Sequence, residues 1–91
     1  MGVMITFRDE DAAFLDWVSA HTHGYIVNAN RIPKAGYLIV HTSTCPHFDR
    51  SLDIRFTHEY VKVCSDDLHE LVSWAENEIG GSLQQCSDCF G

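Results

Sequence analysis

The chain has 91 residues, of which 45% are hydrophobic and 11% aromatic, with only six Gly and two Pro. This composition excludes a disordered or low-complexity chain, and the length predicts one small domain over residues 1–91. The 13 acidic and 6 basic residues give a net charge of -7, which disfavours non-specific binding to nucleic acid or to anionic membranes. No apolar run approaches the ~18 residues of a membrane helix and no secretory signal opens the chain, so we expect a cytoplasmic location.

The first half of the chain predicts a helix followed by a strand hairpin. Residues 1–8 either enter as a strand or form a loose arm. Acidic residues then crowd the start of residues 9–21, where apolar residues recur at helical spacing, so this segment is predicted to be a helix. Residues 25–28 predict a short strand, and the apolar run 37–42 predicts a central strand covered on both faces. Residues 30–36 carry Asn, Pro and Gly and are expected to form the hairpin loop.

The second half predicts a third strand and a second helix. Residues 53–64 alternate in polarity towards their end, so a strand is expected that begins near Ile54 or later and places Val61 and Val63 on one face. Asp67 and Glu70 have capping-box spacing before an apolar helical stripe that ends at Gly80. The chain is therefore predicted to be an α+β domain: a three-stranded, mainly antiparallel sheet with both helices on one face and a metal-stapled C-terminal tail.

Four cysteines predict a metal site that would hold the C-terminal tail. Cys86 and Cys89 form a CxxC pair, while Cys45 and Cys64 each follow a predicted strand. Four thiolates match the ligand set of a closed structural zinc site, so zinc is the expected cofactor. His47 is the favoured substitute for one of the thiols, because it lies only two residues from Cys45.

Three other interpretations of the cysteines stay open. Cys64 could be an ordinary buried thiol, because free cysteine is among the most buried residue types. The CxxC could be a redox pair, although thioredoxin-like pairs open a helix after a strand and this one closes the chain. Two disulfides would form if the protein were exported.

A second group of polar residues lies near the ends of the two hairpin strands. Asn28 and His41 end neighbouring strands, and with Arg31 they could form a small polar pocket; the alternative is that they satisfy backbone groups of the hairpin loops. His41 is also a conceivable metal ligand or, with Cys45, half of a nucleophile pair. The sequence lacks GxSxG, P-loop and HExxH motifs, which disfavours an enzyme.

Several of these segments resemble a small uncharacterised bacterial domain family. The resemblance rests on the runs at residues 24–28, 37–41, 44–46 and 60–64 and on the terminal CxxC. It covers roughly residues 14–90 and implies a bacterial, module-like protein without assigning a reaction. Thr42 departs from the family pattern, which has Arg after the strand-ending His; this casts doubt on any charge-based role there.

These observations favour a non-catalytic, zinc-stabilised interaction module that binds another protein. Tyr37, Phe48 and Trp74 would be its contact anchors, unless they belong to the core. The alternative is a nucleic-acid recognition module in a bacterial defence or regulatory system, and a third is a CxxC redox protein. The nucleic-acid alternative requires a cluster formed by Arg31, Lys34, Arg50 and Arg55.

Overall fold

The structure, a computed structural model, describes residues 4–49 and 55–90. Within these residues it has five strands, three α-helices, one 3-10 helix and one π-helical turn. In chain order they are β1 (Ile5–Phe7), α1 (Asp11–Ala20), β2 (Tyr25–Lys34), β3 (Tyr37–Thr42), η1 (Pro46–Phe48), β4 (Tyr60–Ser65), α2 (Leu68–Trp74), η2 (Ala75–Ile79), β5 (Gln84–Gln85) and α3 (Ser87–Phe90).

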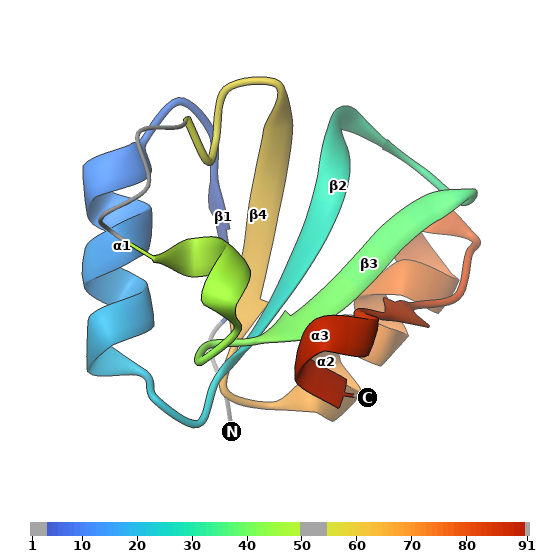
Figure 1. The fold of residues 1–91 in the computed structure, drawn as a ribbon. Coiled ribbons are helices and arrows are strands. Elements are labelled where there is room, and N and C mark those ends of the chain that lie inside the picture. Colours follow the sequence, from blue (N-terminus) through green and yellow to red (C-terminus); the bar gives the residue numbers. More distant parts are fainter. Residues whose placement is uncertain (1–3, 50–54, 91) are drawn as a thin grey trace.

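The strands form one mixed sheet in the order β1-β4-β2-β3-β5 (Figure 1). All neighbours are antiparallel except β3 and β5, which run parallel. The three predicted strands are the central ones, and the predicted antiparallel hairpin is confirmed as β2 and β3. The sheet has five strands rather than three because β1 and β5 are added at its edges. With three and two residues, these strands are too short to show a periodic pattern.

β2 is longer than predicted, because it continues through residues 30–34, which were expected to be loop. Its pairing with β3 shifts register between Ala29 and Lys34. Such an irregularity accommodates Pro33, which cannot donate a backbone hydrogen bond to the ladder. β4 begins at Tyr60; the earlier start predicted near Ile54 lies outside the described residues.

The two longer helices cover opposite faces of the sheet, so the prediction that they share one face is wrong. Phe14 of α1 belongs to one core cluster, whereas Leu71 of α2 and Ala75 belong to the other. In Figure 1, α1 lies in front of the sheet and α2 behind it. This is the arrangement that the central strands require, because apolar side chains project from both of their faces.

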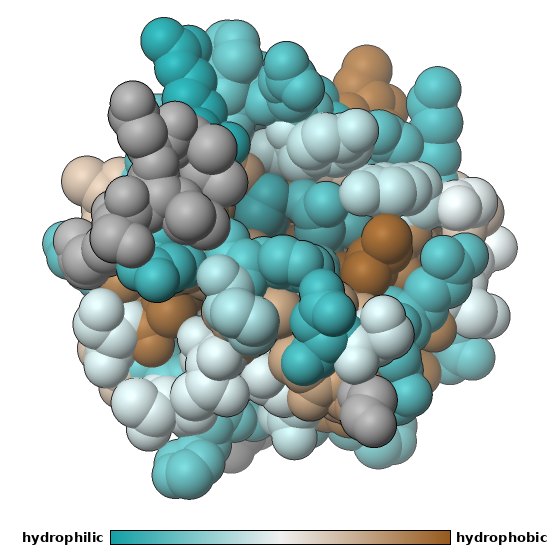
Figure 2. Space-filling view, viewed as in Figure 1, coloured by the Kyte–Doolittle hydropathy of each residue, from teal (hydrophilic) through white to brown (hydrophobic). Residues whose placement is uncertain are grey.

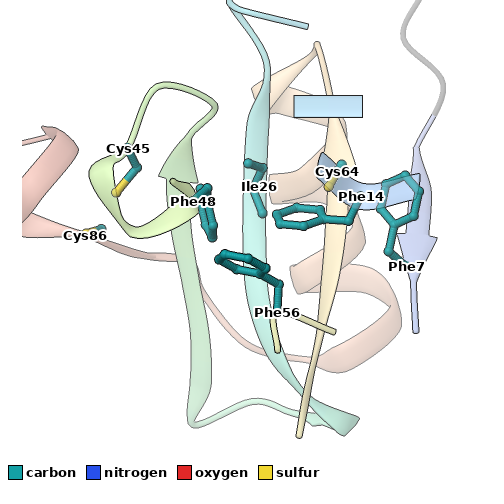
Figure 3. Close-up of a cluster of buried hydrophobic side chains, with 8 residues drawn as sticks. All are labelled: Phe7, Phe14, Ile26, Cys45, Phe48, Phe56, Cys64 and Cys86. Carbon is teal, nitrogen blue, oxygen red and sulfur yellow. The ribbon is translucent and has the colours of Figure 1, made fainter. Parts of the chain in front are cut away.

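The core on the α1 side is aromatic and contains three of the four thiols (Figure 3). Phe14 lies at its centre, with ring centroids 5.9, 5.3 and 5.8 Å from those of Phe7, Phe48 and Phe56. Such edge-on and tilted pairs each stabilise the core beyond their buried area. The core on the α2 side is aliphatic and is built from alternate residues of β2, β3 and β4, including Val61 and Val63 as predicted.

The second helix begins and ends at the predicted capping residues, Asp67 and Gly80. The Asp67 side chain accepts a 3.0 Å hydrogen bond from the His69 backbone N–H and so caps α2. Gly80 ends η2 in the left-handed region at φ 80°, a conformation that glycine adopts without strain. From there the chain returns along β3 as β5 and α3, which brings the C-terminal cysteines to the edge of the sheet. No helix within residues 4–49 and 55–90 combines the length and apolarity needed to cross a membrane.

Candidate metal centre

Strand register brings four metal-ligand side chains together at the end of β3. β5 pairs in parallel with β3, with Val40 opposite Gln85, so the following residues, His41 and Cys86, lie side by side. The backbone N–H of Cys86 donates a 3.0 Å hydrogen bond to the carbonyl of Val40 and fixes this placement. Cys89 follows one turn of α3 later.

Cys45 reaches the same place through the turn that follows β3. Its backbone N–H donates to the carbonyl of Thr42 at 3.1 Å, and its carbonyl accepts from the Phe48 N–H at 3.1 Å. The chain therefore turns back over the end of the strand. His41 and Cys45 come from one local turn, whereas Cys86 and Cys89 come from a segment about forty residues away in the sequence.

The ligand atoms of His41, Cys45, Cys86 and Cys89 all lie within 4.8 Å of one another. A tetrahedral zinc ion with the usual bond lengths holds S and N ligands about 3.6 Å apart and two S ligands about 3.8 Å apart. The observed separation between Cys45 Sγ and His41 Nδ1 is 3.6 Å. The remaining atoms need to close by no more than about 1 Å, so three thiols and one imidazole form a candidate structural metal site.

His41 has the protonation state that a ligand needs. Its side chain is buried, and burial lowers its pKa to about 4, with further lowering from nearby His47 and Lys62. The imidazole is therefore neutral at physiological pH and keeps a nitrogen lone pair for a metal.

The three thiols are free; Cys45 and Cys86 are buried and Cys89 is half-buried, and backbone donors support two of them. Burial raises the pKa of Cys45 to about 12, so a metal ion must displace a proton to bind there. The Thr42 backbone N–H donates to Cys89 Sγ at 3.3 Å, and the His47 backbone N–H donates to the Cys45 thiol. Donors of this kind stabilise thiolates in metal sites and orient them.

Cys64, predicted as a ligand, is not a member of this group. It lies on β4 opposite Ile26 of β2, and Ile26 in turn lies opposite His41 of β3. A whole strand therefore separates Cys64 from the ligands, a gap of about 10 Å at the usual strand spacing. Figure 3 shows Cys64 beside Phe14, with Ile26 between it and Cys45. The sequence prediction assumed that the strands carrying Cys45 and Cys64 were neighbours.

His47, predicted as the substitute ligand, lies just outside the four. Its Nδ1 is 3.8 Å from Cys86 Sγ, and its Nε2 lies 2.8 Å from Asp88 Oδ2 in an exposed ion pair. His47, Cys86 and Asp88 form a second group with ligand atoms within 4.8 Å of one another. Because His47 comes from η1 and Asp88 from α3, the pair joins both segments over the metal site.

The predicted polar pocket is present in part. Asn28 and His41 line the same groove on the α1 side of the sheet. Arg31 does not line it, because its guanidinium is held by the Asp9 carboxylate at 2.8 and 3.0 Å. This ion pair holds the pKa of Asp9 well below its usual range.

The predicted contact residues lie mainly in or against the core, and the predicted basic residues differ in their surroundings. Phe48 is part of the aromatic core, Trp74 packs against the aliphatic core, and Tyr37 is half-buried. Among the basic residues named for a nucleic-acid surface, Arg31 is paired with an acid, Lys34 and Arg55 are exposed, and Arg50 lies outside the described residues.

The CxxC pair follows β5 and opens α3, the strand-to-helix position that its place near the end of the chain did not suggest. Comparisons with family models, curated proteins and solved structures find no match to this chain. The resemblance to a small bacterial domain family therefore remains a prediction.

Proposed function

We propose that this chain is a small, non-catalytic module that is stabilised by one zinc ion and binds another protein. One observation carries the proposal: four ligand atoms of His41, Cys45, Cys86 and Cys89 lie within 4.8 Å of one another. Four protein ligands close the coordination sphere of zinc and leave no position for a substrate, which is the mark of a structural site. Three thiolates and an imidazole are donors that zinc prefers over magnesium or calcium.

The short elements that the ion would join support a structural role for it. β5 has two residues and α3 has four, and neither is stable without tertiary support. Zinc would tie both of them to β3 and to the turn at Cys45. In a chain of this size, metal binding contributes directly to the folding free energy.

The protein-binding part of the proposal is supported by an exposed apolar side chain on the β2–β3 hairpin. Ile32 is 80% exposed, and it stands next to Pro33 within β2. Burial of such a side chain against a partner is favourable by about 1.5–3 kcal/mol. The net charge of -7 and the engagement of Arg31 by Asp9 favour a protein over a nucleic acid as that partner.

The zinc proposal is tested by the mass of the intact chain under non-denaturing conditions, with and without a chelator. We expect one zinc ion per chain, and a lower melting temperature once it is removed, because the C-terminal segment loses its anchor. A chain that purifies without metal, binds none when zinc is added and melts at the same temperature with chelator would overturn the proposal.

The partner proposal needs a separate experiment. A photo-crosslinking residue at Ile32 is expected to capture a protein, and excess wild-type chain should abolish the capture. The same residue at Glu76, exposed on η2, is the control. If capture is equal at both positions, or if an oligonucleotide binds with steep salt dependence, the protein-binding part is refuted while the zinc result stands.

A further inference from the structure

A buried lysine lies on the face of the sheet that carries the metal site. Lys62 of β4 is 6% exposed, and its Nζ donates 2.6 Å hydrogen bonds to Asn28 Oδ1 and to the carbonyl of Phe56. Asn28 faces Lys62 directly across the β2–β4 ladder, and its amide donates in turn to the Tyr37 hydroxyl at 3.0 Å. A short polar chain therefore crosses the middle of the sheet.

The charge of Lys62 has no paired counter-charge in this network. Both of its acceptors are neutral, and no carboxylate of the described residues forms an ion pair with it. Burial lowers the pKa of Lys62 to about 8, and this outweighs the opposite effect of Cys64 and of the Asp11 carboxylate, which acts on the ammonium without a direct contact. A lysine ammonium has three N–H donors, and the described residues accept from two of them. Buried cations are normally paired, so the remaining N–H would favour an anionic acceptor.

Two adjoining cavities lie over this network. One of about 400 Å³ and one of about 180 Å³ share Asn28, His41 and His47 in their walls. Figure 2 views this face, which is hollowed near its centre and lined mostly by polar side chains. The combined space falls in the range of small-molecule sites.

The walls combine flat apolar surface with the cation. The larger cavity is lined by Tyr37 and Ile39, and the smaller one by Phe56, Tyr60 and Lys62. The Tyr37 and Tyr60 rings lie 5.4 Å apart between centroids, and Lys62 Nζ lies 6.0 Å from the Tyr60 centroid. Rings of this kind pack against a planar apolar group, and an ammonium binds a carboxylate through a charge-assisted hydrogen bond.

We propose that this groove over β2, β3 and β4 binds a small aromatic carboxylate, whose oxygen accepts the remaining N–H of Lys62 while its ring lies between the tyrosine and phenylalanine side chains. The inference goes beyond the proposed function, and it requires the metal site only as part of the wall.

Benzoate is the probe, and benzyl alcohol, with the same ring and no charge, is its control. In a ¹⁵N–¹H NMR titration of the intact chain, benzoate is expected to shift the amide signals of Asn28 and Lys62 saturably, whereas benzyl alcohol at equal concentration leaves them unchanged. The variant Lys62→Met is expected to weaken benzoate binding at least tenfold. Lys34→Met, the same change at the exposed end of β2, leaves it unaltered.

A second variant keeps the inference falsifiable if Lys62→Met does not fold. Asn28→Asp places a carboxylate at the position 2.6 Å from Lys62 Nζ, where it supplies a direct counter-charge from within the chain. We expect it to raise the melting temperature and to abolish benzoate binding. The inference is overturned if benzoate shifts no signal in the groove, if benzyl alcohol binds equally well, or if either groove variant binds benzoate as the wild type does. Zinc content is measured in the same samples, so failure here is distinguished from failure of the metal proposal.

Discussion

His41 Nδ1 lies 3.6 Å from Cys45 Sγ, the separation that two ligands of one zinc ion have. The two residues lie at the end of β3 and in the turn after it, so half of the ligand set is formed by local structure. The other half, Cys86 and Cys89, is brought in by the parallel pairing of β5. A metal at this point would join the end of β3 and the turn after it to the last described segment of the chain.

The structure and the sequence prediction differ in the fourth ligand, which is His41 in the structure and Cys64 in the prediction. We expect His41→Ala to lose most of its zinc affinity, and Cys64→Ala to keep one zinc per chain while losing about 1 kcal/mol of stability through the small cavity left in the core. Zinc stoichiometry of the two variants checks this. Retention of zinc by His41→Ala together with its loss from Cys64→Ala would reverse the assignment.

The ion pair between His47 and Asp88 is expected to support the metal site from outside the ligand set. Its atoms lie 2.8 Å apart, and His47 also approaches Cys86. Asp88→Asn should raise the zinc dissociation constant about tenfold, as loss of an outer-shell partner does elsewhere. Asp66→Asn, which makes the same charge change in an ion pair with His21, is the control. Equal zinc affinity in competition with a chelator for both variants would contradict this role.

Asp11 links the start of α1 to the chain before β4. It accepts hydrogen bonds from the Phe56 and Thr57 backbone N–H groups at 3.1 and 2.8 Å and from the Thr57 hydroxyl at 2.6 Å. Burial alone would raise the pKa of Asp11, but these hydrogen bonds outweigh burial and lower it below the usual 3.8. The folded state therefore binds this proton less readily than the unfolded state does.

The stabilisation by Asp11 is thus complete above pH 4 and is lost as the pH falls through the lowered pKa. We expect Asp11→Asn to lower the free energy of unfolding by about 1 kcal/mol at pH 7, a modest loss because partial exposure weakens these hydrogen bonds. The loss should be smaller towards pH 3, where the Asp11 carboxylate of the wild type begins to be protonated. Urea unfolding across this pH range measures the difference. Glu76→Gln, on exposed η2, should show no such trend. A cost for Asp11→Asn that does not change with pH would contradict the account.

Gly81 allows the segment that leads to β5 to approach the β2–β3 turn. A Cβ at this position would lie 2.7 Å from the Cα and the carbonyl oxygen of Ala35, whereas a Cβ at Gly36 would meet nothing within 4 Å. Gly81→Ala should therefore destabilise the fold by about 1–3 kcal/mol and Gly36→Ala should be nearly neutral. Thermal melts of the two variants check this, and similar melting temperatures would show that the contact is dispensable.

The sequence predicted the parts of the fold that rest on local pattern. α1, β3 and the cap at Asp67 follow from spacing and charge, and they are found where expected. The edge strands were missed because strands of two or three residues have no periodicity. The helices were placed on one face because hydrophobic stripes do not reveal which side of a sheet they cover.

The same division holds for the metal centre. The number of cysteines and the CxxC spacing predicted a group of all four, and three of them, Cys45, Cys86 and Cys89, lie together. Strand order decided the fourth ligand: β2 lies between β3 and β4, so Cys64 is separated from the group and His41 occupies the place. Long-range pairing decides which strands are neighbours in a sheet, so strand order cannot be predicted from the residues of one strand.

X-ray absorption at the zinc edge tests the central claim most directly, because it counts the atoms bound to the metal. For the zinc-loaded chain we expect three sulfur neighbours at about 2.3 Å and one nitrogen neighbour at about 2.0–2.1 Å. Four sulfur neighbours would bring Cys64 back into the site, and a shell of oxygen and nitrogen atoms would show that zinc binds elsewhere; either result contradicts the site described here.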